Sequence, residues 1–455
     1  MSENVPSQPN AAKQPATAAP IASASTAAVA AAPNATSATT NTPTGPAAAP
    51  AAAIASTASH DPATTVAPDV ARQAKIEAGE EKWLYPQEPF RFDATNLNPL
   101  LVFSSNLKAS DITFQTGESV IIEVHGKLHK VTKHALTQTE VSDILNFIYG
   151  GNGAAQLLSG QDVDTFYEMR PTREERFRYR VNGTACQVAG HNAIQITMRT
   201  IPLQPPTVQQ LGIPKELLDV ITPRDGVVYV TGPTGSGKST LLAAVIRSIA
   251  EDPACNRKIL TYEAPIEFVY DDINSVSAVI SQSEIPRHLP TFAAGVRNAL
   301  RRKPRLILVG EARDAETISA VIEAALTGHP VYTTLHTVGV VDTVRRLVGS
   351  FPAEERDGRT LDILETLRLI VCQKLLPSTD GKQVALREYL AFDTGMREAL
   401  QDSSTDQLMI NVRKMLDERG QSFLKDAKAK FEAGILPEKE FRLIELDANR
   451  QAKHD

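Results

Sequence analysis

Several features that define other classes of protein are scarce in this sequence. The 455 residues include three cysteines, Cys186, Cys255 and Cys372, which lie far apart and lack the spacing of a metal or redox motif. We therefore expect three buried, free thiols in a reducing compartment. No apolar run approaches about 18 residues, so we expect no membrane span. The first ten residues lack a basic stretch and an apolar core, so we expect no signal peptide.

Basic charge and aromatic residues are also in short supply. The formal net charge is -6, whereas a dedicated nucleic-acid binder usually carries a basic face. Nucleic acid is therefore not expected as a direct substrate, although a basic channel inside an oligomer stays open. The first aromatic residue is Trp83, and the residues before it are mostly Ala, Pro, Thr, Ser, Asn and Val. Such a segment buries too little apolar surface to offset the entropy of ordering, so residues 1–80 are predicted to form a disordered tail.

Three further regions differ in pattern. Residues 88–202 combine short alternating strands with a helix near 137–150, which predicts a small α+β domain. Residues 208–380 alternate apolar strands with helices, which predicts an α/β domain with a mainly parallel sheet. Residues 383–455 contain one more strand and are otherwise predicted to be mostly helical. In a parallel sheet the functional residues gather where the strands end, so polar residues at those positions are the first candidates.

The stretch VVYVTGPTGSGKSTLLAAVI, residues 227–246, carries the clearest functional motif. An apolar run leads into G-x-x-x-x-G-K-[ST] and a helical run follows, which is the order that a phosphate-binding loop requires. Its glycines let backbone N–H groups turn toward phosphates, and the start of the helix adds its positive end. The motif predicts binding of ATP with Mg²⁺: Lys238 reaches the β- and γ-phosphates, and the Ser239 hydroxyl binds the metal. The residues assigned to nucleotide binding are Gly232, Pro233, Thr234, Gly235, Ser236, Gly237, Lys238, Ser239 and Thr240.

Glu263 ends a second predicted strand, in the stretch TYEAPIEFVY. A carboxylate at that position could polarise a water for attack on the γ-phosphate, and Glu267 is a second acid that could assist. A glutamate at a strand end can equally be a solvated surface residue, and this motif alone leaves both interpretations open.

A third predicted strand, in RLILVGEARDAET, has the position of a Walker B strand. An Asp usually ends that strand and holds Mg²⁺, but this sequence has Gly310 followed by Glu311, so Glu311 is the expected metal-binding acid. Asp314 is predicted to be the N-cap of the next helix. The stretch LTGHPVYTTLHT adds His329 and His336. A lone histidine is more often structural, but His336 ends a strand where its imidazole could sense the γ-phosphate.

Taken together, GPTGSGKST, TYEAPIEFVY, ILVGEARDAET and TGHPVYTTLHT resemble, in their order and spacing, four motifs of the secretion ATPase superfamily: the Walker A, Asp box, atypical Walker B and His box. ASDITF, VHGKL, RYRVNG and MRTIP resemble the N-terminal domain of that superfamily. Its members drive type II secretion, type IV pili and type IV secretion. The resemblance covers about residues 90–400 and implies a RecA-like P-loop domain preceded by a small, PAS-like α+β domain.

The resemblance also favours one branch of the superfamily. Assembly ATPases usually carry a paired C-x-x-C metal motif, which this sequence lacks, so no metal cluster is expected. RHLPTFAAGVRNALRRKPRLILVGEARDAETI, together with Ala264 where pilus ATPases usually have Asp, is most similar to the Dot/Icm-type (type IVB) secretion ATPases and their conjugative-plasmid relatives. The C-terminal signature of pilus retraction ATPases is poorly matched by GMREALQD.

By this resemblance Glu263 is the catalytic glutamate, Glu311 the Walker B acid and His336 the His-box sensor. The resemblance also implies a homo-hexameric ring with ATP between subunits, in which arginines of the N-terminal domain reach a neighbour's phosphates. The candidates here are Arg178, Arg180 and Arg199. The alternating charges of a solvated sheet face would look the same, so a structural role for these arginines stays open.

The sequence therefore predicts a hexameric, cytoplasmic ATPase, peripherally associated with an inner-membrane secretion complex, that hydrolyses ATP to power type IVB secretion or conjugative transfer. A retraction motor of type IV pili is the alternative within the superfamily. A ring-shaped nucleic-acid translocase is an alternative of another class, and it would show salt-sensitive binding and DNA-stimulated activity. A nucleotide-gated adaptor with little turnover is a third, which a steady-state ATPase assay separates.

Overall fold

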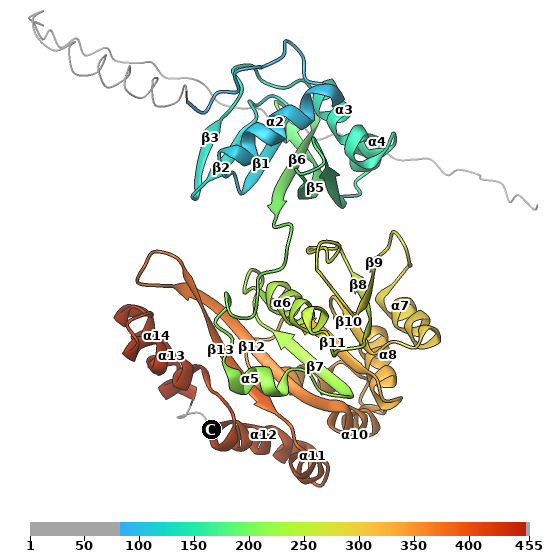
Figure 1. Ribbon diagram of the computed structural model, residues 1–455, viewed down its shortest axis with the longest axis vertical. Coiled ribbons are helices and arrows are strands. Elements are labelled where there is room, and N and C mark those ends of the chain that lie inside the picture. The colour runs from blue at the N-terminus through green and yellow to red at the C-terminus, as the bar shows by residue number, and fades with distance from the viewer. Residues whose placement is uncertain (1–81, 452–455) are drawn as a thin grey trace, which may run out of the picture. The chain divides into compact units, whose positions relative to one another are not determined.

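The computed structural model describes residues 82–451, which form two β-sheets with their helices (Figure 1). The tail predicted over residues 1–80 lies outside the described residues. The first sheet has one apolar core, and the second sheet has a separate apolar core on each of its faces. Within residues 82–451, no helix combines the length and the apolar character needed to cross a membrane.

The first sheet has six antiparallel strands. They are β1 (Asp111–Gln115), β2 (Ile121–Val124), β3 (Lys127–Lys130), β4 (Val163–Met169), β5 (Phe177–Val188) and β6 (His191–Ile201). Their order in the sheet is β3-β2-β1-β6-β5-β4. Side chains alternate between buried and part-exposed along β1, as expected for a strand with one covered face.

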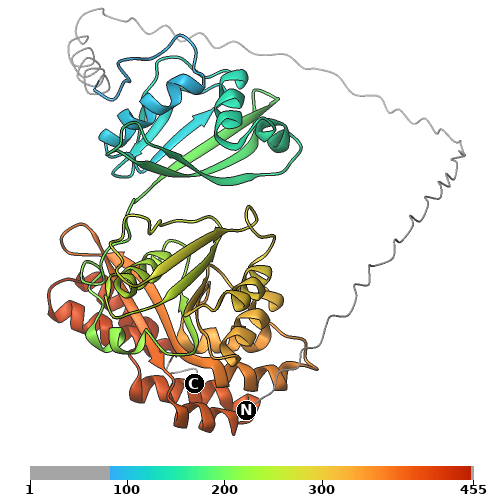
Figure 2. The same cartoon turned by 45° about the vertical axis from the view of Figure 1, so that its right-hand side comes forward.

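Three helices accompany this sheet. They are α2 (Ala94–Asn106), α3 (Gln138–Tyr149) and α4 (Gly153–Leu158). They lie along one face of the sheet, where α3 and α4 pack on β6 (Figure 2). Helix α3 begins at a capping box, because the Thr137 hydroxyl accepts from the Glu140 N–H and the Glu140 carboxylate accepts from the Thr137 N–H. Beside β3, the Trp83 ring stacks on His129 with the ring centroids 3.9 Å apart.

The second sheet has seven strands. They are β7 (Gly226–Thr231), β8 (Lys258–Glu263), β9 (Val279–Glu284), β10 (Leu306–Val309), β11 (Pro330–Leu335), β12 (Leu367–Pro377) and β13 (Gln383–Ala391). Their order is β13-β12-β7-β11-β10-β8-β9, and every pair is parallel except β12 with β13. The predicted α/β fold with a mainly parallel sheet is confirmed.

Two strands of this sheet differ from the sequence-based expectation. Strand β13 pairs with β12 from Gln383 to Ala391, so the sheet continues past residue 380, where its domain was expected to end. The antiparallel return after a short turn is what brings that strand back into the sheet. Strand β9 was not predicted, and it lies parallel to β8 at the opposite edge of the sheet.

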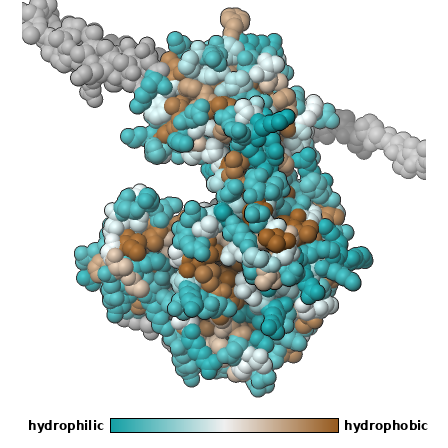
Figure 3. All heavy atoms as spheres, viewed as in Figure 1, coloured by the Kyte–Doolittle hydropathy of each residue, from teal (hydrophilic) through white to brown (hydrophobic). Residues whose placement is uncertain are grey.

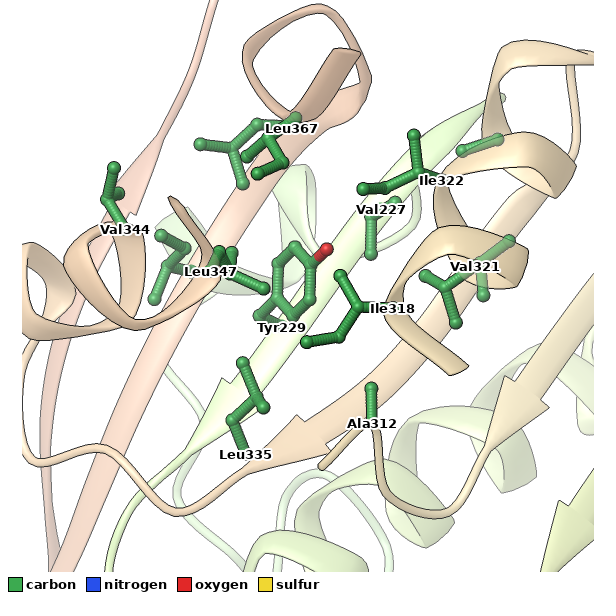
Figure 4. Close-up of a cluster of buried hydrophobic side chains, with 14 of the residues drawn as sticks. Val227, Tyr229, Ala312, Ile318, Val321, Ile322, Leu335, Val344, Leu347 and Leu367 are labelled. Atoms are coloured by element: carbon green, nitrogen blue, oxygen red, sulfur yellow. The ribbon is translucent and has the colours of Figure 1, made fainter. Parts of the chain in front are cut away.

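Helices cover both faces of the seven-stranded sheet. They are α5 (Lys215–Val220), α6 (Lys238–Glu251), α7 (Phe292–Ala299), α8 (Ala315–Leu326), α9 (Val340–Gly349) and α10 (Arg356–Thr366), with a short 3-10 turn, Leu300–Arg302, after α7. On one face α6 packs against Val228 and Val230 of β7. On the other face the Tyr229 ring lies between Ile318 of α8 and Leu347 of α9 (Figure 4). Buried β7 residues therefore point in both directions, which is why the strand reads as an unbroken apolar run.

The chain after β13 is helical, as predicted. Its helices are α11 (Thr394–Gln401), α12 (Thr405–Arg419), α13 (Phe423–Glu432) and α14 (Glu438–Gln451). Helices α11 and α12 extend the core that contains Tyr229, and α13 packs on β13. On the face drawn in Figure 3 hydrophilic residues predominate, and the apolar residues gather in smaller patches.

The cysteines correct one expectation. All three are free, as predicted, but only Cys372 is buried, whereas Cys186 and Cys255 are partly exposed. Cys372 lies on β12, next to the edge strand β13, and its thiol is 3.7 Å from the Thr337 carbonyl oxygen. Burial raises the pKa of the Cys372 thiol to about 11, so this thiol stays protonated and unreactive near neutral pH.

Candidate active site

The phosphate-loop motif lies between β7 and α6, at the carboxyl end of the sheet. Gly237 has a φ of 80° and is the N-cap of α6, a left-handed position that favours glycine. At Gly232 an added Cβ would meet the Gln373 carbonyl oxygen at 2.2 Å, so only glycine fits against β12. The Lys238 ammonium donates to the carbonyl oxygens of Gly232 and Pro233, at 2.9 Å and 3.1 Å. The loop thus curls around its own lysine.

A cavity of about 570 Å³ opens above this loop. It brings together residues from the phosphate loop, from the ends of β8, β10 and β11, and from the six-stranded sheet. The charged and titratable side chains that line it include Arg180, Lys238, Glu263, Glu267, Glu311 and His336. These residues come from positions 180 to 336 of the sequence, and their convergence at one place is the main observation on the site.

Glu263, the last residue of β8, is buried at the floor of the cavity. Its Oε1 accepts hydrogen bonds from the Thr261 hydroxyl at 2.7 Å and from the Gln282 amide at 3.1 Å. Burial raises the pKa of the Glu263 carboxyl to about 7, and the two hydrogen bonds only partly oppose that rise. The carboxyl is therefore poised between its neutral and ionised forms near physiological pH, as a general base should be. Glu263 is therefore not a solvated surface residue, and its catalytic role stays a prediction.

Glu311 lies two residues after β10, and His336 directly follows β11. The Glu311 Oε1 and the His336 Nε2 are 3.4 Å apart, and the His336 Nδ1 is 3.5 Å from the Lys238 ammonium. Because an ammonium can only donate, Nδ1 accepts and the imidazole hydrogen lies on Nε2, facing Glu311. His336 therefore links the lysine of the phosphate loop to the acid after β10. Arg313 also contacts Glu311, at 2.9 Å.

Desolvation dominates the electrostatics of Lys238. Burial lowers the pKa of the Lys238 ammonium, and the charges of Glu311 and Glu267 oppose that shift. A cation that is partly desolvated and incompletely neutralised is an anion-binding group, and phosphate oxygens would satisfy it.

Gly310 occupies the position where the common Walker B pattern has Asp, and the packing gives a reason. A Cβ at Gly310 would lie 3.2 Å from the Tyr262 carbonyl oxygen and 3.3 Å from the Glu263 Cα. A side chain there would press on the backbone that carries Glu263. The acid follows one position later, as Glu311. Asp314 caps α8 through a 2.8 Å hydrogen bond from the Thr317 N–H, as predicted.

The cavity also offers oxygen ligands for Mg²⁺. The Ser239 hydroxyl and the Glu311 carboxylate both line it. Magnesium prefers such oxygen donors, keeps several waters, and usually takes one or two carboxylates together with substrate phosphates. These two residues fit that pattern. The described residues hold no group of three or more His, Cys, Asp or Glu side chains that would bind a metal by themselves.

The arginines of the six-stranded sheet lie in three different environments. Arg178 is buried, donates to the Ile266 carbonyl oxygen at 3.2 Å and pairs with Glu168 at 3.3 Å. Burial lowers the pKa of its guanidinium, against the attraction of Glu168. Arg180 lines the cavity, held by Asp164 at 2.8 Å, and Arg199 pairs with Asp111 at 2.8 Å.

A second cavity, of about 600 Å³, adjoins the first. Arg180, Thr240, Glu267 and Phe268 line both cavities, so the two adjoin along these residues. Prolines and Ile201 give the second cavity an apolar wall, and Arg199 also lies in it. His329, by contrast, precedes β11 at the opposite end of the strand from His336, where it contacts Thr327 and the Ala324 carbonyl oxygen.

Sequence reasoning missed two residues that hold the site. Gln282 comes from β9, whose alternating polar residues gave too weak a strand signal next to the apolar neighbours. Gln373 lies in β12, within the apolar run LRLIVCQKLLP. A single amide in the middle of such a run was a usable signal, because a buried polar group needs partners.

A mainly parallel sheet whose first strand runs through a glycine-rich loop into a helix defines the class of P-loop nucleotide-binding proteins. Within that class the chain belongs to the type II/IV secretion system protein family, whose model matches residues 98–431. The superfamily expected from the motifs is thereby confirmed.

Three members of the family illustrate which proteins this chain is similar to. The crystal structure of the Legionella pneumophila ATPase DotB is 57% identical, with a TM-score of 0.76, and the match covers 80% of this chain and 99% of that one. The type IV pilus retraction ATPase PilT of Pseudomonas aeruginosa is 34% identical over 69% of this chain and 87% of its own length. A crystal structure of the pilus retraction motor PilT with bound ADP has a TM-score of 0.65 and 28% identity, covering 75% of this chain and 94% of that one.

Proposed function

We propose that this protein is a Mg²⁺-dependent ATPase that works as a homo-hexamer at an inner-membrane type IVB secretion or conjugation complex, on its cytoplasmic side. One observation carries the proposal: Lys238, Glu263 and Glu311 line a single cavity in a chain that is 57% identical to the ATPase DotB. The PilT structure with bound ADP supports a nucleotide as the ligand of this cavity.

Each residue of the cavity has a role in this proposal. Lys238 and the N–H groups of the loop bind the β- and γ-phosphates. Ser239 and Glu311 would hold Mg²⁺, which when bound neutralises charge on the phosphate oxygens. Glu263, in its ionised form, accepts a proton from the attacking water and orients it. His336 bridges Lys238 and Glu311, so it can respond to the arrival or loss of the γ-phosphate.

The two adjoining cavities suit the two ends of ATP. The first, lined by charged groups, takes the phosphates, and the second, with prolines and Ile201, takes the base and ribose. Arg180 lines both cavities, so it can reach a phosphate from the six-stranded sheet, whereas Arg199 lines only the second cavity. We retain the proposal that at least one of these arginines, or Arg178, acts on a neighbouring subunit's nucleotide.

A retraction motor of type IV pili is the second candidate function. The specific observation in its favour is the 34% identity to the Pseudomonas aeruginosa retraction ATPase, over 87% of that protein. Both functions use the same ATPase chemistry and differ in the complex that the protein serves.

The variant Lys238→Ala tests the shared chemistry. It removes the ammonium expected on the β- and γ-phosphates, so steady-state phosphate release from ATP should fall to background. Lys382→Ala, on an exposed turn, is the matched control and should turn over ATP like the wild type. Chelation of Mg²⁺ should stop the wild type, and added Mg²⁺ should restore it. Undiminished turnover by purified Lys238→Ala protein contradicts the assignment.

The complex served is tested in cells of the source bacterium. A strain that carries only Lys238→Ala should lose export of type IVB substrates, and its pilus-based twitching should be unchanged. Loss of twitching with intact export would assign the protein to the retraction motor instead.

A further inference from the structure

Gln373 is a polar residue in the middle of a buried strand, and it contacts the phosphate loop directly. Its side chain is 3% exposed. The Gln373 Nε2 donates a hydrogen bond to the Ser236 carbonyl oxygen at 2.6 Å. The backbone of Gln373 also lies against the loop, because its carbonyl oxygen fills the space beside Gly232. Gln373 therefore contacts the phosphate loop through both its side chain and its backbone.

The orientation of the Gln373 amide is determined by its other partner. Arg387 lies directly opposite Gln373 in the β12–β13 register, and its Nε donates to the Gln373 Oε1 at 2.8 Å. A guanidinium has donors only, so the amide oxygen must face Arg387. The amide nitrogen must then face Ser236, and the reverse orientation would place two donors against each other.

Arg387 is itself held on all sides. It is 3% exposed, and its terminal nitrogens donate to the carbonyl oxygens of Leu211 and Gly212 at 2.9 Å and 3.1 Å. Its backbone N–H donates to the Asp426 carboxylate at 2.7 Å. Residues 211–212 lie between the two sheets in sequence, and Asp426 lies on α13. A rigid series of hydrogen bonds thus runs from these two segments through Arg387 and Gln373 to the phosphate loop.

The bond to Ser236 determines the direction of the next N–H group. In a trans peptide the carbonyl of one residue and the N–H of the next point in opposite directions. With the Ser236 carbonyl held toward β12, the Gly237 N–H points away from β12, to the side of the loop where Lys238 and Ser239 line the cavity. This N–H belongs to the residue that caps α6, where anions bind best.

We infer that Gln373 is a positioning residue for nucleotide phosphate: it holds the Ser236–Gly237 peptide so that the Gly237 N–H is directed at the phosphate before nucleotide arrives, and Arg387 keeps the Gln373 amide in the orientation that does so. The inference rests on the proposed function in one respect, that nucleotide phosphates bind this loop. It predicts that Gln373 contributes to affinity for phosphate and not to the chemistry of the γ-phosphate.

The variant Gln373→Glu separates the two bonds. A glutamate keeps the size of the side chain and pairs with Arg387, but when ionised it cannot donate to Ser236. The dissociation constant for a fluorescent ADP analogue should rise about tenfold, because the Ser236–Gly237 peptide must then be oriented at the expense of binding free energy. The KM for ATP should rise by a similar factor, with kcat within about twofold of the wild type. Gln383→Glu, the same change at an exposed position of β13, is the matched control and should bind like the wild type.

Adenosine distinguishes positioning from general damage. A disturbed pocket would weaken adenosine and ADP alike, whereas a misdirected peptide weakens only ligands with phosphate. Competition by adenosine should therefore be unchanged in Gln373→Glu. Equal loss for both ligands, or an ADP affinity equal to that of the wild type, overturns the inference. If Gln373→Glu does not fold, as judged by circular dichroism, Gln373→Met, which is uncharged and similar in length, is measured in the same way. Failure of the wild type to bind any nucleotide contradicts the proposed function instead.

Discussion

The charged residues of the two sheets are compensated in different ways. In the six-stranded sheet Arg180 and Arg199 each pair with a carboxylate at 2.8 Å. At the carboxyl edge of the seven-stranded sheet, Glu263 is buried with neutral hydrogen-bond donors only, and Lys238 is held by carbonyl oxygens. Burial accordingly raises the pKa of Glu263 and lowers the pKa of Lys238, which favours the neutral form of each group.

This difference indicates which charged groups are left available to bind a ligand and which are already paired within the protein. A group that is fully paired in the resting protein gains little from a ligand, whereas a desolvated and incompletely paired group gains much. The burial of Glu263 and Lys238 therefore supports the proposal that the carboxyl edge of the seven-stranded sheet binds a substrate. Arg180 and Glu311 are exceptions, because each is ion-paired and still lines the cavity.

The strongest test of the comparison is Arg180→Ala. Arginines that contact the transferred phosphoryl group contribute about 10³-fold to turnover, so we expect a loss of that order with ATP binding retained. Phosphate release and fluorescent-nucleotide binding measure the two effects. Arg170→Ala, an exposed arginine beside the same strand pair, is the control and should turn over ATP normally. Normal turnover by Arg180→Ala would show that the ion-paired Arg180 is structural only, and Arg199 would become the next candidate.

A mixing experiment extends this test to the proposed homo-hexameric ring. Arg180→Ala is combined with Lys238→Ala, and subunit exchange is verified with a labelled subunit. In mixed rings an intact phosphate loop can face an intact Arg180 of a neighbour. Recovered turnover assigns Arg180 to the neighbour's site, as proposed, and its absence assigns Arg180 to its own.

The next largest expected effect is the dependence of the unfolding free energy on pH that the burial of Glu263 causes. Its pKa is raised from 4.5 to about 7, so the folded protein holds this proton more tightly than the unfolded chain. Unfolding free energy should therefore fall as pH rises from 4.5 through 7, by about 3 kcal/mol, since each pKa unit corresponds to about 1.4 kcal/mol. Urea unfolding of the wild type and of Glu263→Gln at pH 5 and pH 8 measures it. Glu263→Gln should be the more stable protein at pH 8, and Glu251→Gln, on an exposed helix end, should keep the wild-type dependence.

The same variant tests catalysis. Glu263→Gln removes the base but keeps the size of the side chain, so turnover should fall by about 10² or more with ATP binding intact. In the wild type kcat should rise with pH through about 7, the pKa of Glu263, because only the ionised form accepts a proton. Glu311→Gln should also reduce turnover, through Mg²⁺. Normal hydrolysis by Glu263→Gln with an inactive Glu311→Gln would show that the two roles are reversed.

The smallest effect belongs to Asp314. It lies three residues after Glu311, but its carboxylate caps α8 and does not line the cavity. Asp314→Ala should lower the unfolding free energy by about 1 kcal/mol, with turnover of the folded protein unchanged. Asp314→Ser, which keeps a capping oxygen, should recover most of the stability in the same urea titration. A large loss of turnover in Asp314→Ala would show that Asp314 also takes part in ATP hydrolysis.

Features that depend on neighbouring residues in the sequence could be predicted, whereas features that depend on tertiary contacts could not. The phosphate loop and the Asp314 cap each depend on residues within a few positions, so sequence spacing sufficed. The environment of Glu263 could not be read in this way, because Gln282 reaches it from a strand 19 positions further on. Arg178 and Arg180 have the same strand periodicity, yet one is buried and the other lines the cavity. Which neighbour covers each arginine is decided by the fold as a whole.

Trp83 is the only tryptophan in the chain, and it is stacked on His129 beside β3. Excited selectively, its fluorescence reports on the six-stranded sheet alone, while circular dichroism averages over every helix and strand. A single denaturant titration followed by both signals would tell whether the two sheets melt as one cooperative unit or in sequence. The protein thus contains an optical probe of its own, and no label needs to be introduced near the nucleotide.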